Sequence, residues 1–214
     1  MGTQLSVAAI ILAAGRSSRM QGPNKLVAQL GGRPIVRIVA EAALASHASP
    51  VTVVTGHQSD LVRSALSGLP VEFALNPNFA EGLSTSLKTG IAALSPRVDA
   101  AIVLLGDMPA VTAAMIDRLI SAHDPQSGAE IIVAAHGGQR GNPVLWPQRF
   151  FAELLATTGD AGGRTLLRDH AALTREVDLG PAVLLDLDTR EALAAAGGVI
   201  AGGDSGPKGA QSAS

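Results

Sequence analysis

Short apolar runs alternate along the chain with segments in which apolar residues recur at helical spacing. Five runs have the length and composition of strands buried on both faces: Val7–Leu12, Val51–Thr55, Val71–Leu75, Ala101–Leu105 and Ile131–Ala135. Between them, one helical face is indicated by Ile35, Ile38, Val39 and Ala42, by Leu61, Ala65 and Leu66, and by Met115, Ile116, Leu119 and Ile120. Thr112 is placed to cap the last of these helices. The alternation predicts an α/β fold with a doubly wound, mostly parallel sheet.

The pattern changes after residue 136. Gly-Asn-Pro-Val-Leu-Trp at 141–146 precedes a helical segment near Gln148–Ala156, a glycine turn at 162–163 and an apolar run, Val183–Asp186, that predicts a late strand. We expect this part to add an antiparallel strand and a lid over one edge of the sheet. The length of 214 residues fits one domain, and we expect it to span residues 1–201, followed by a polar, disordered tail at 202–214.

The first strand runs into a loop of small and cationic residues. Residues 12–25 read Leu-Ala-Ala-Gly-Arg-Ser-Ser-Arg-Met-Gln-Gly-Pro-Asn-Lys. Small side chains let backbone N–H groups approach an anion, and Arg16, Arg19 and Lys25 add three positive charges. The loop is neither a Walker A loop nor a dinucleotide-binding Gly-x-Gly-x-x-Gly. It indicates the handling of a triphosphate, with an ordinary turn carrying solvated charges as the alternative.

Carboxylates follow two later apolar runs. Asp107 follows Ala101–Leu105 after Gly106, at the strand end where a parallel sheet binds its ligands. It could hold Mg²⁺, and the alternative is a carboxylate that caps its own turn. Asp188 lies in Asp-Leu-Asp-Thr at 186–189, and its alternative is a capping box with Glu191 for a final helix. Both roles of Asp188 can coexist.

Residues 76–90 contain a third candidate segment. Gly82 precedes Ser84, Thr85 and Ser86, and a helical run follows. This pattern is typical of a helix N-terminus that offers donors to an anion or to the edge of a base, or of an ordinary Ser/Thr N-cap.

Composition removes several classes of function. The net charge of −2 with scattered signs argues against a nucleic-acid-binding face or a membrane-surface patch. The chain has no cysteine, which excludes disulfides and thiolate metal sites and is compatible with the cytoplasmic location that we expect. Its five histidines lack metal-ligand spacing, and no export signal is visible.

Together these motifs resemble a known family. Leu-Ala-Ala-Gly-x-Ser-x-Arg-Met, Asn-Lys-Leu and Gly-Asp-Met-Pro resemble the nucleotidyltransferases of the molybdopterin type. Residues 80–88, together with Gly-Asn-Pro-Val-Leu-Trp and Asp-Leu-Asp-Thr, narrow the resemblance to the molybdenum cofactor cytidylyltransferase branch, over about residues 7–196. It implies a Rossmann-like fold of the nucleotidyltransferase type, with a nucleotide half at about 7–110 and an acceptor half at about 111–201.

The resemblance, with the residue chemistry above, gives the site that we expect. The catalytic residues are Arg19, Lys25 and Asp107, and the ligands of a Mg²⁺ cofactor are Asp107 and Asp188. The nucleotide-binding residues are Leu12, Ala13, Ala14, Gly15, Lys25, Thr55, Gly56, Asn76, Gly82, Ser84 and Ser86. The acceptor-binding residues are Gly141, Asn142, Pro143, Gly163 and Arg164.

The implied reaction transfers CMP from CTP to the terminal phosphate of molybdopterin, with release of pyrophosphate. The attacking phosphate is already anionic, so positioning and charge neutralisation matter more than a general base. The dinucleotide product would pass to a molybdoenzyme or its chaperone as a transient partner. Three alternatives stay open: the same reaction with GTP, transfer to another small phosphorylated acceptor, and a non-catalytic nucleotide-binding or cofactor-delivery module.

Overall fold

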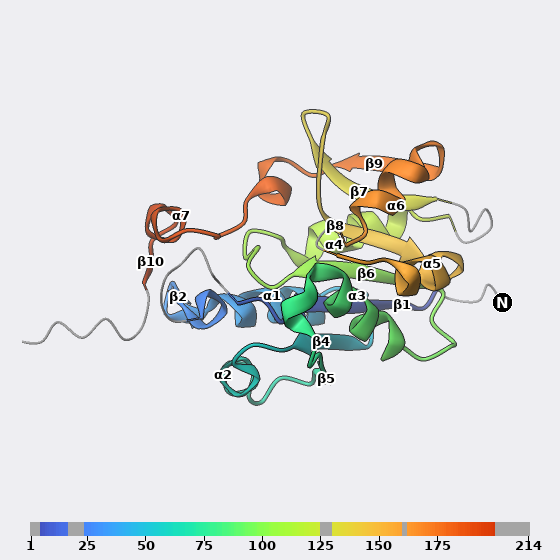
Figure 1. The fold of residues 1–214 in the computed structure, drawn as a ribbon. Coiled ribbons are helices and arrows are strands. Elements are labelled where there is room, and N and C mark those ends of the chain that lie inside the picture. The colour runs from blue at the N-terminus through green and yellow to red at the C-terminus, as the bar shows by residue number, and fades with distance from the viewer. Residues whose placement is uncertain (1–4, 17–23, 125–129, 160–161, 200–214) are drawn as a thin grey trace, which may run out of the picture.

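The computed structural model describes residues 5–16, 24–124, 130–159 and 162–199, and their centre is a seven-stranded sheet (Figure 1). Its order is β5-β4-β1-β6-β8-β7-β9. The strands are β1 (Val7–Ala13), β4 (Val51–Thr55), β5 (Glu72–Leu75), β6 (Ala100–Leu105), β7 (Ile131–His136), β8 (Gln139–Pro147) and β9 (Thr174–Asp178). Only β8 pairs antiparallel with its neighbours. The predicted α/β class, the mostly parallel sheet and the added antiparallel strand are confirmed.

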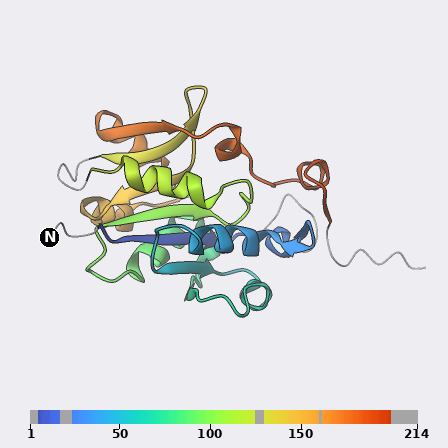
Figure 2. The same cartoon turned by 180° about the vertical axis from the view of Figure 1, so that it is seen from behind.

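Helices cover both faces of the sheet, as the opposite views of Figures 1 and 2 show. One face packs against α1 (Ile35–Leu44), α2 (Ser59–Ala65) and α4 (Ala113–Ala122), and the other against α3 (Leu83–Ala92), α5 (Phe151–Ala156) and α6 (Arg164–Asp169). Alternation along β1 divides its side chains between the two cores, so Ile11 lies in one and Ile10 in the other. Thr112 caps α4 by accepting from the Met115 amide, as predicted.

A second, three-stranded sheet lies beyond the carboxyl ends of the parallel strands (Figure 1). It consists of β10 (Gly198–Val199), β2 (Gln29–Leu30) and β3 (Arg33–Pro34), next to α7 (Arg190–Ala195). A small core of Ala28, Ile35, Leu187 and Leu193 joins this region to α1.

Short 3₁₀ helices complete the described structure: η2 (Lys25–Val27), η3 (Phe79–Glu81), η4 (Gln148–Phe150), η5 (Ala171–Leu173) and η6 (Pro181–Leu184). The helical segment predicted near Gln148–Ala156 is therefore η4 followed by α5. In the described ranges, no helix is long and apolar enough to cross a membrane.

Two sequence-based predictions need correction, and one strand was not predicted. The run Val183–Asp186 is no strand, because its first residues belong to η6, which opens with Pro181 after Gly180 at φ +81°. The last strand of the sheet is instead β9, whose polar Thr-Arg-Glu-Val-Asp hid it from a search for apolar runs. The run Val71–Leu75 does contain a strand, but β5 is outermost in the sheet and partly exposed, with Leu75 exposed by 61%. The predicted tail at 202–214 lies outside the described residues.

Helix α3 packs so closely against β1 that no side chain larger than hydrogen fits at Gly90. A Cβ there would stand 2.5 Å from Cγ2 of the fully buried Ile10 and 3.1 Å from Cγ2 of Val54. We expect Gly90→Ala to lower the free energy of unfolding by about 1–3 kcal/mol through overpacking. This loss would appear although alanine is the better helix former by about 1 kcal/mol. Urea denaturation measures it, with Lys88→Ala on the same helix as the control, and an unchanged or raised midpoint would contradict the packing argument.

Candidate active site

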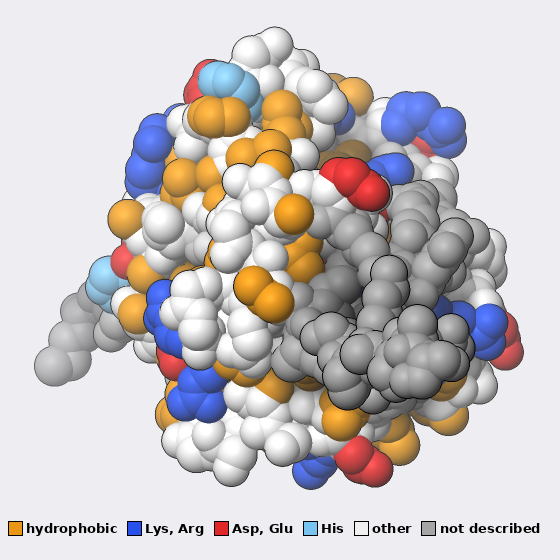
Figure 3. Space-filling view, turned by 90° about the vertical axis from the view of Figure 1, so that its left-hand side faces the viewer, with side chains coloured by type: hydrophobic (Ala, Val, Ile, Leu, Met, Phe, Trp, Pro, Cys, Tyr) orange, Lys and Arg blue, Asp and Glu red, His pale blue; other side chains and the backbone are white. Residues whose placement is uncertain are grey.

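The carboxyl ends of β1, β4, β5 and β6 meet at one edge of the sheet, and a cavity of about 440 Å³ opens there. Figure 3 looks onto this end of the molecule, where hydrophobic side chains gather left of centre. The charged residues that line the cavity are Arg16, Lys25, Asp107, Asp186 and Asp188. They come from three separate stretches of the sequence, so the fold assembles the site.

Lys25 is fixed by the short helix that it begins. The Asn24 side chain accepts a hydrogen bond from the Leu26 amide at 3.0 Å, which caps η2. Leu26 is buried in the main core, and its side chain also lines the cavity. The lysine stem is held at the cavity wall, and the side chain is only 13% exposed.

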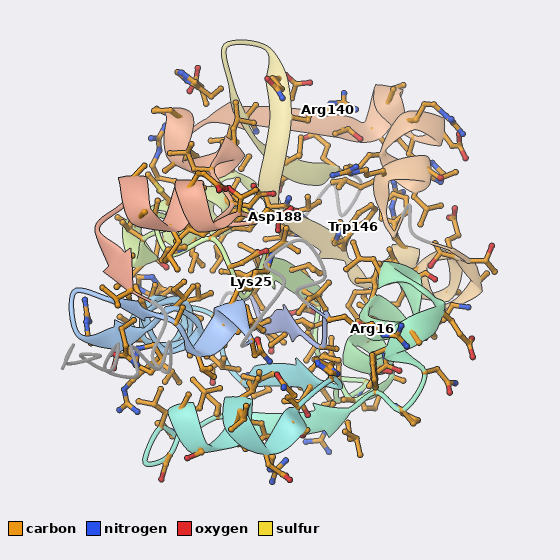
Figure 4. All side chains as sticks on the ribbon, turned by 60° about the vertical axis from the view of Figure 1, so that its left-hand side comes forward. Arg16, Lys25, Arg140, Trp146 and Asp188 are labelled. Carbon is orange, nitrogen blue, oxygen red and sulfur yellow. The ribbon has the colours of Figure 1, made fainter. Side chains whose placement is uncertain are left out.

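The ammonium of Lys25 lies between two carboxylates. One of them belongs to Asp188, which is labelled near Lys25 in Figure 4. The Lys25 Nζ donates to Asp107 Oδ2 at 2.5 Å and also to Asp188 Oδ1. Burial lowers the pKa of Lys25, but the charges and hydrogen bonds of Asp107 and Asp188 outweigh burial and hold the pKa above its ordinary value. Lys25 is therefore a fixed positive charge at any pH near neutrality.

A backbone contact brings the two carboxylates together. The Leu187 amide donates to the Asp107 carbonyl at 3.1 Å, and the Leu187 side chain is anchored in the small core beside α1. The residues on either side of Leu187 consequently flank the Asp107 loop. Partial desolvation, and then the charges of Asp188 and Asp107, raise the pKa of Asp186, so this third carboxylate adds to a locally acidic wall.

The donor set fits a magnesium ion that keeps other ligands. Two carboxylates that share one cation supply the hard oxygen ligands that Mg²⁺ prefers. In the part of the chain that the structure describes, no group of three or more acidic or histidine side chains could hold a metal ion. Remaining ligands would have to be phosphate oxygens and water, as is usual for Mg²⁺ at nucleotide sites.

The cap of α7 differs from the capping-box prediction. Thr189, not Asp188, is the N-cap, and its side chain accepts from the Ala192 amide at 3.1 Å. Because the hydroxyl of Thr189 caps the helix, the carboxylate of Asp188 is turned toward Lys25 instead.

The cavity brings together about half of the predicted nucleotide-binding residues. Those that line it are Leu12, Ala14, Gly15, Lys25, Gly82 and Ser86. Gly82 is the N-cap of α3 at φ +113°, a conformation that favours glycine. Ala13 does not line the cavity, because strand alternation turns its side chain into the opposite core. Arg19 lies outside the described residues.

Three other predicted nucleotide-binding residues, Thr55, Asn76 and Ser84, do not line the cavity and instead bond to its neighbouring residues. Thr55 Oγ1 accepts from Ser59, and the buried Ser84 donates its amide to the Gly159 carbonyl. Buried Asn76 donates to Thr85 Oγ1 at 2.9 Å and to Ser86 Oγ at 3.0 Å. These contacts fix the start of α3 and orient Ser86, a supporting role that spacing alone could not distinguish from direct contact.

Sequence reasoning missed an aromatic residue in the cavity wall. Phe79 lines the cavity, and a Cβ on Gly56 would lie 2.8 Å from both Phe79 Cβ and Ala14 Cβ. Glycine at 56 therefore lets Phe79 pack beside Ala14. The Arg16 guanidinium lies 5.5 Å from the centroid of the Phe79 ring. Phe79 is one of only four phenylalanines in the chain, which was the one available signal.

A second cavity of about 410 Å³ adjoins the first, because Leu12, Leu83 and Leu105 line both. Of the predicted acceptor residues, the second cavity is lined by Gly141, Asn142, Gly163 and Arg164. Pro143 is buried in β8 and does not line it.

The walls of the second cavity are largely apolar, with arginines among them. Trp146 forms part of the wall, and a Cβ on Gly163 would lie 2.6 Å from Trp146 Cζ2, so glycine at 163 keeps the indole in place. Arg140 donates to Glu176 Oε1 at 2.7 Å. The side chain of Arg164 is exposed and makes no hydrogen bond or ion pair within the described ranges. Arg140 and Trp146 were not among the predicted site residues.

The family model for the MobA-like NTP transferase domain matches residues 9–175. The chain belongs to this family. It is therefore placed in the nucleotidyltransferase class, which agrees with a cavity lined by Arg16, Lys25 and Asp107.

The individual curated relatives share about a third of their residues with this chain over the matched region. The bifunctional protein GlmU of Anaeromyxobacter sp. (strain Fw109-5) is 32% identical over 167 residues, which cover 72% of this chain and 34% of that protein. The chain thus spans about a third of the length of this curated relative.

Solved structures share the fold over nearly the whole chain. A nucleotidyl transferase from Methanothermobacter thermautotroptrophicus has a TM-score of 0.77 at 24% identity, covering 87% of this chain and 94% of that one. Rv0371c from Mycobacterium tuberculosis H37Rv has a TM-score of 0.80 at 24% identity, covering 91% and 98%. Its complex with manganese has a TM-score of 0.77 at 24% identity, covering 89% and 97%.

The cap at Thr189 gives a direct test of how Asp188 is presented. Thr189→Ala should speed hydrogen exchange at the Ala192 amide, because an N-cap contributes about 1 kcal/mol. Glu191→Gln should leave that exchange unchanged. If protection of the Ala192 amide depends on Glu191 and not on Thr189, the observed cap is contradicted and the predicted capping box of Asp188 with Glu191 is supported.

Proposed function

We propose that the protein transfers CMP from CTP to the terminal phosphate of molybdopterin, releasing pyrophosphate and forming molybdopterin cytosine dinucleotide. The observation that carries this proposal is the pair of adjoining cavities. One holds Lys25 between carboxylates, and the other is largely apolar with arginines, so two different phosphate-bearing molecules could meet over Leu12, Leu83 and Leu105.

The first cavity suits the nucleotide. Gly15, exposed at the end of β1, leaves open space where a side chain would stand, which lets an anion approach the backbone closely. Lys25 would neutralise charge that develops on the leaving pyrophosphate, and Arg19 is proposed to share this role. Magnesium held by Asp107 and Asp188 would supply charge neutralisation between the phosphates. Among the described residues, no histidine lines either cavity, in keeping with an acceptor phosphate that needs no general base.

The second cavity suits an acceptor with a flat, weakly polar body and a phosphate. Val144, Trp146 and Leu167 bury apolar surface there, as a fused heterocycle requires, and Asn142 can pair with its polar edge. Arg164 is available for a phosphate group. A sugar phosphate would leave hydroxyl groups against apolar walls and is disfavoured. Several residues that line the second cavity precede residue 111. The division of the chain into a nucleotide half and an acceptor half at about residue 110 therefore stays a prediction.

Base selection is proposed to depend on Ala14 and Ser86. Ala14 places a methyl group on the wall beside Phe79, which narrows the space for a purine. Ser86 Oγ accepts from Asn76, which leaves its O–H to donate toward an acceptor such as O2 or N3 of cytosine. The product is expected to pass to a molybdoenzyme or its chaperone in the cytoplasm.

The proposal is tested by a product assay with CTP or GTP, each with and without molybdopterin. Release of pyrophosphate with formation of the cytosine dinucleotide only when molybdopterin is present supports it. If the guanine dinucleotide is the main product, GTP and not CTP is the nucleotide substrate. Turnover only with another phosphorylated acceptor would contradict molybdopterin as the acceptor. Tight binding of CTP without any turnover would indicate a non-catalytic nucleotide-binding module.

Asp107→Asn should lower turnover by about two or more decades while the fold persists. Losing one negative charge weakens the proposed magnesium site and leaves phosphate repulsion unneutralised, which costs several kcal/mol of barrier. Pyrophosphate release in saturating Mg²⁺ measures the loss. Asp99→Asn is a matched control, because Asp99 precedes β6 at the opposite edge, where it accepts from the Ser6 amide. Near-wild-type rates for Asp107→Asn would leave Asp107 as a turn-capping group only.

Ala14→Gly should erode the preference for CTP over GTP without inverting it. One methyl group on a pocket wall is worth only about 1–3 kcal/mol of discrimination, and the hydrogen bond from Ser86 remains. Competition between equal concentrations of the two nucleotides gives the ratio of products. An unchanged product ratio would show that Ala14 does not contact the base. The double variant Ala14→Gly, Ser86→Ala should erode the preference for CTP further than Ala14→Gly alone.

A further inference from the structure

We infer that Lys25 occupies the divalent-cation position between Asp107 and Asp188 in the nucleotide-free protein, so that metal is taken up together with a nucleoside triphosphate that accepts the lysine ammonium. This inference rests on the metal role proposed for the two aspartates. It adds an order of binding that the proposed reaction does not itself require.

The geometry carries the argument. One Nζ atom contacts both carboxylates, at 2.5 Å for Asp107 Oδ2 and also at Asp188 Oδ1. A divalent cation bound to the same two oxygens would have to lie where that ammonium lies. Lys25 and a metal ion therefore cannot both hold these two oxygen atoms at once.

The surroundings keep the ammonium there. Lys25 is 13% exposed and Asp107 15%, so water screens the contact only weakly. Arg16, the other described cation of the cavity, contacts the Phe79 ring and not the carboxylates. A metal ion on its own must therefore displace a shielded ion pair.

A triphosphate removes this obstacle. Its oxygens offer Lys25 new acceptors within the same cavity, while the accompanying metal takes over the carboxylates. The exchange replaces one positive charge between the aspartates by two, and it moves the lysine charge to the phosphates. Charge thus stays balanced only when metal and nucleotide enter together.

Binding of Mn²⁺ to the full-length protein tests the inference, followed by the electron paramagnetic resonance signal of the free ion. Wild type should bind Mn²⁺ alone weakly, and Lys25→Met should bind it at least about tenfold more tightly, because two carboxylates lose their competing cation. Lys25→Arg, which keeps the charge, and Lys88→Met, which changes a lysine that lines neither cavity, should both behave as wild type. Equal Mn²⁺ affinity in wild type and Lys25→Met would overturn the inference.

A measurement on the unaltered protein covers the case in which Lys25→Met does not fold. The chain has only three lysines, so protein with isotope-labelled lysine gives three side-chain signals by nuclear magnetic resonance, assignable with Lys25→Arg and Lys88→Met. Mg²⁺ alone should leave the Lys25 signal in place, and Mg²⁺ with a nucleoside triphosphate should shift it. A shift of equal size with Mg²⁺ alone would overturn the inference.

Parallel arms with CTP and GTP separate this inference from the proposed function. If only GTP with Mg²⁺ shifts the Lys25 signal, the exchange is supported and the cytidylyl assignment fails. If CTP supports turnover but Mg²⁺ alone already displaces Lys25, the reaction stands and the order of binding fails.

Discussion

The ammonium of Lys25 is held between carboxylates that lie 82 and 163 positions away in sequence, and the rest of the site depends on that convergence. Each partner is placed by a different part of the fold. Lys25 is placed by a capped 3₁₀ turn, Asp107 by the end of the central strand β6, and Asp188 by a segment whose neighbour Leu187 bonds to the backbone of Asp107. The three carboxylates Asp107, Asp186 and Asp188 would repel one another more strongly without this cation.

Sequence reasoning succeeded where the hydrophobic pattern determines the structure. The runs that form β1, β4, β6 and β7 are buried on both faces, and their strand ends predicted the edge at which Lys25 and Asp107 meet. It failed where burial is partial, as for polar β9 at the sheet edge. The capping-box alternative for Asp188 was also wrong, because Thr189 and Asp188 are adjacent and both can cap a helix, so only the fold decides which of them does.

The wall residues show a second limit of the sequence. Asn76 and Thr55 are polar and close to the cavity, yet their side chains are engaged with Ser86 and Ser59. Phe79 and Trp146 carry no charge and follow no motif of phosphate chemistry, yet both line cavities. Spacing along a chain identifies which loops converge, whereas the direction of each side chain depends on packing partners such as Gly56 and Gly163.

The bond from the Leu187 amide to the Asp107 carbonyl joins the last third of the described chain to the first parallel half of the sheet. During synthesis, the loop after β1 and the carboxylate after β6 leave the ribosome long before residues 186–188. A nascent chain can therefore form most of its sheet while Lys25 still lacks one of its two carboxylates. Completion of the charged site is thereby coupled to emergence of the segment that follows β9, so a chain arrested before it would carry an unfinished site.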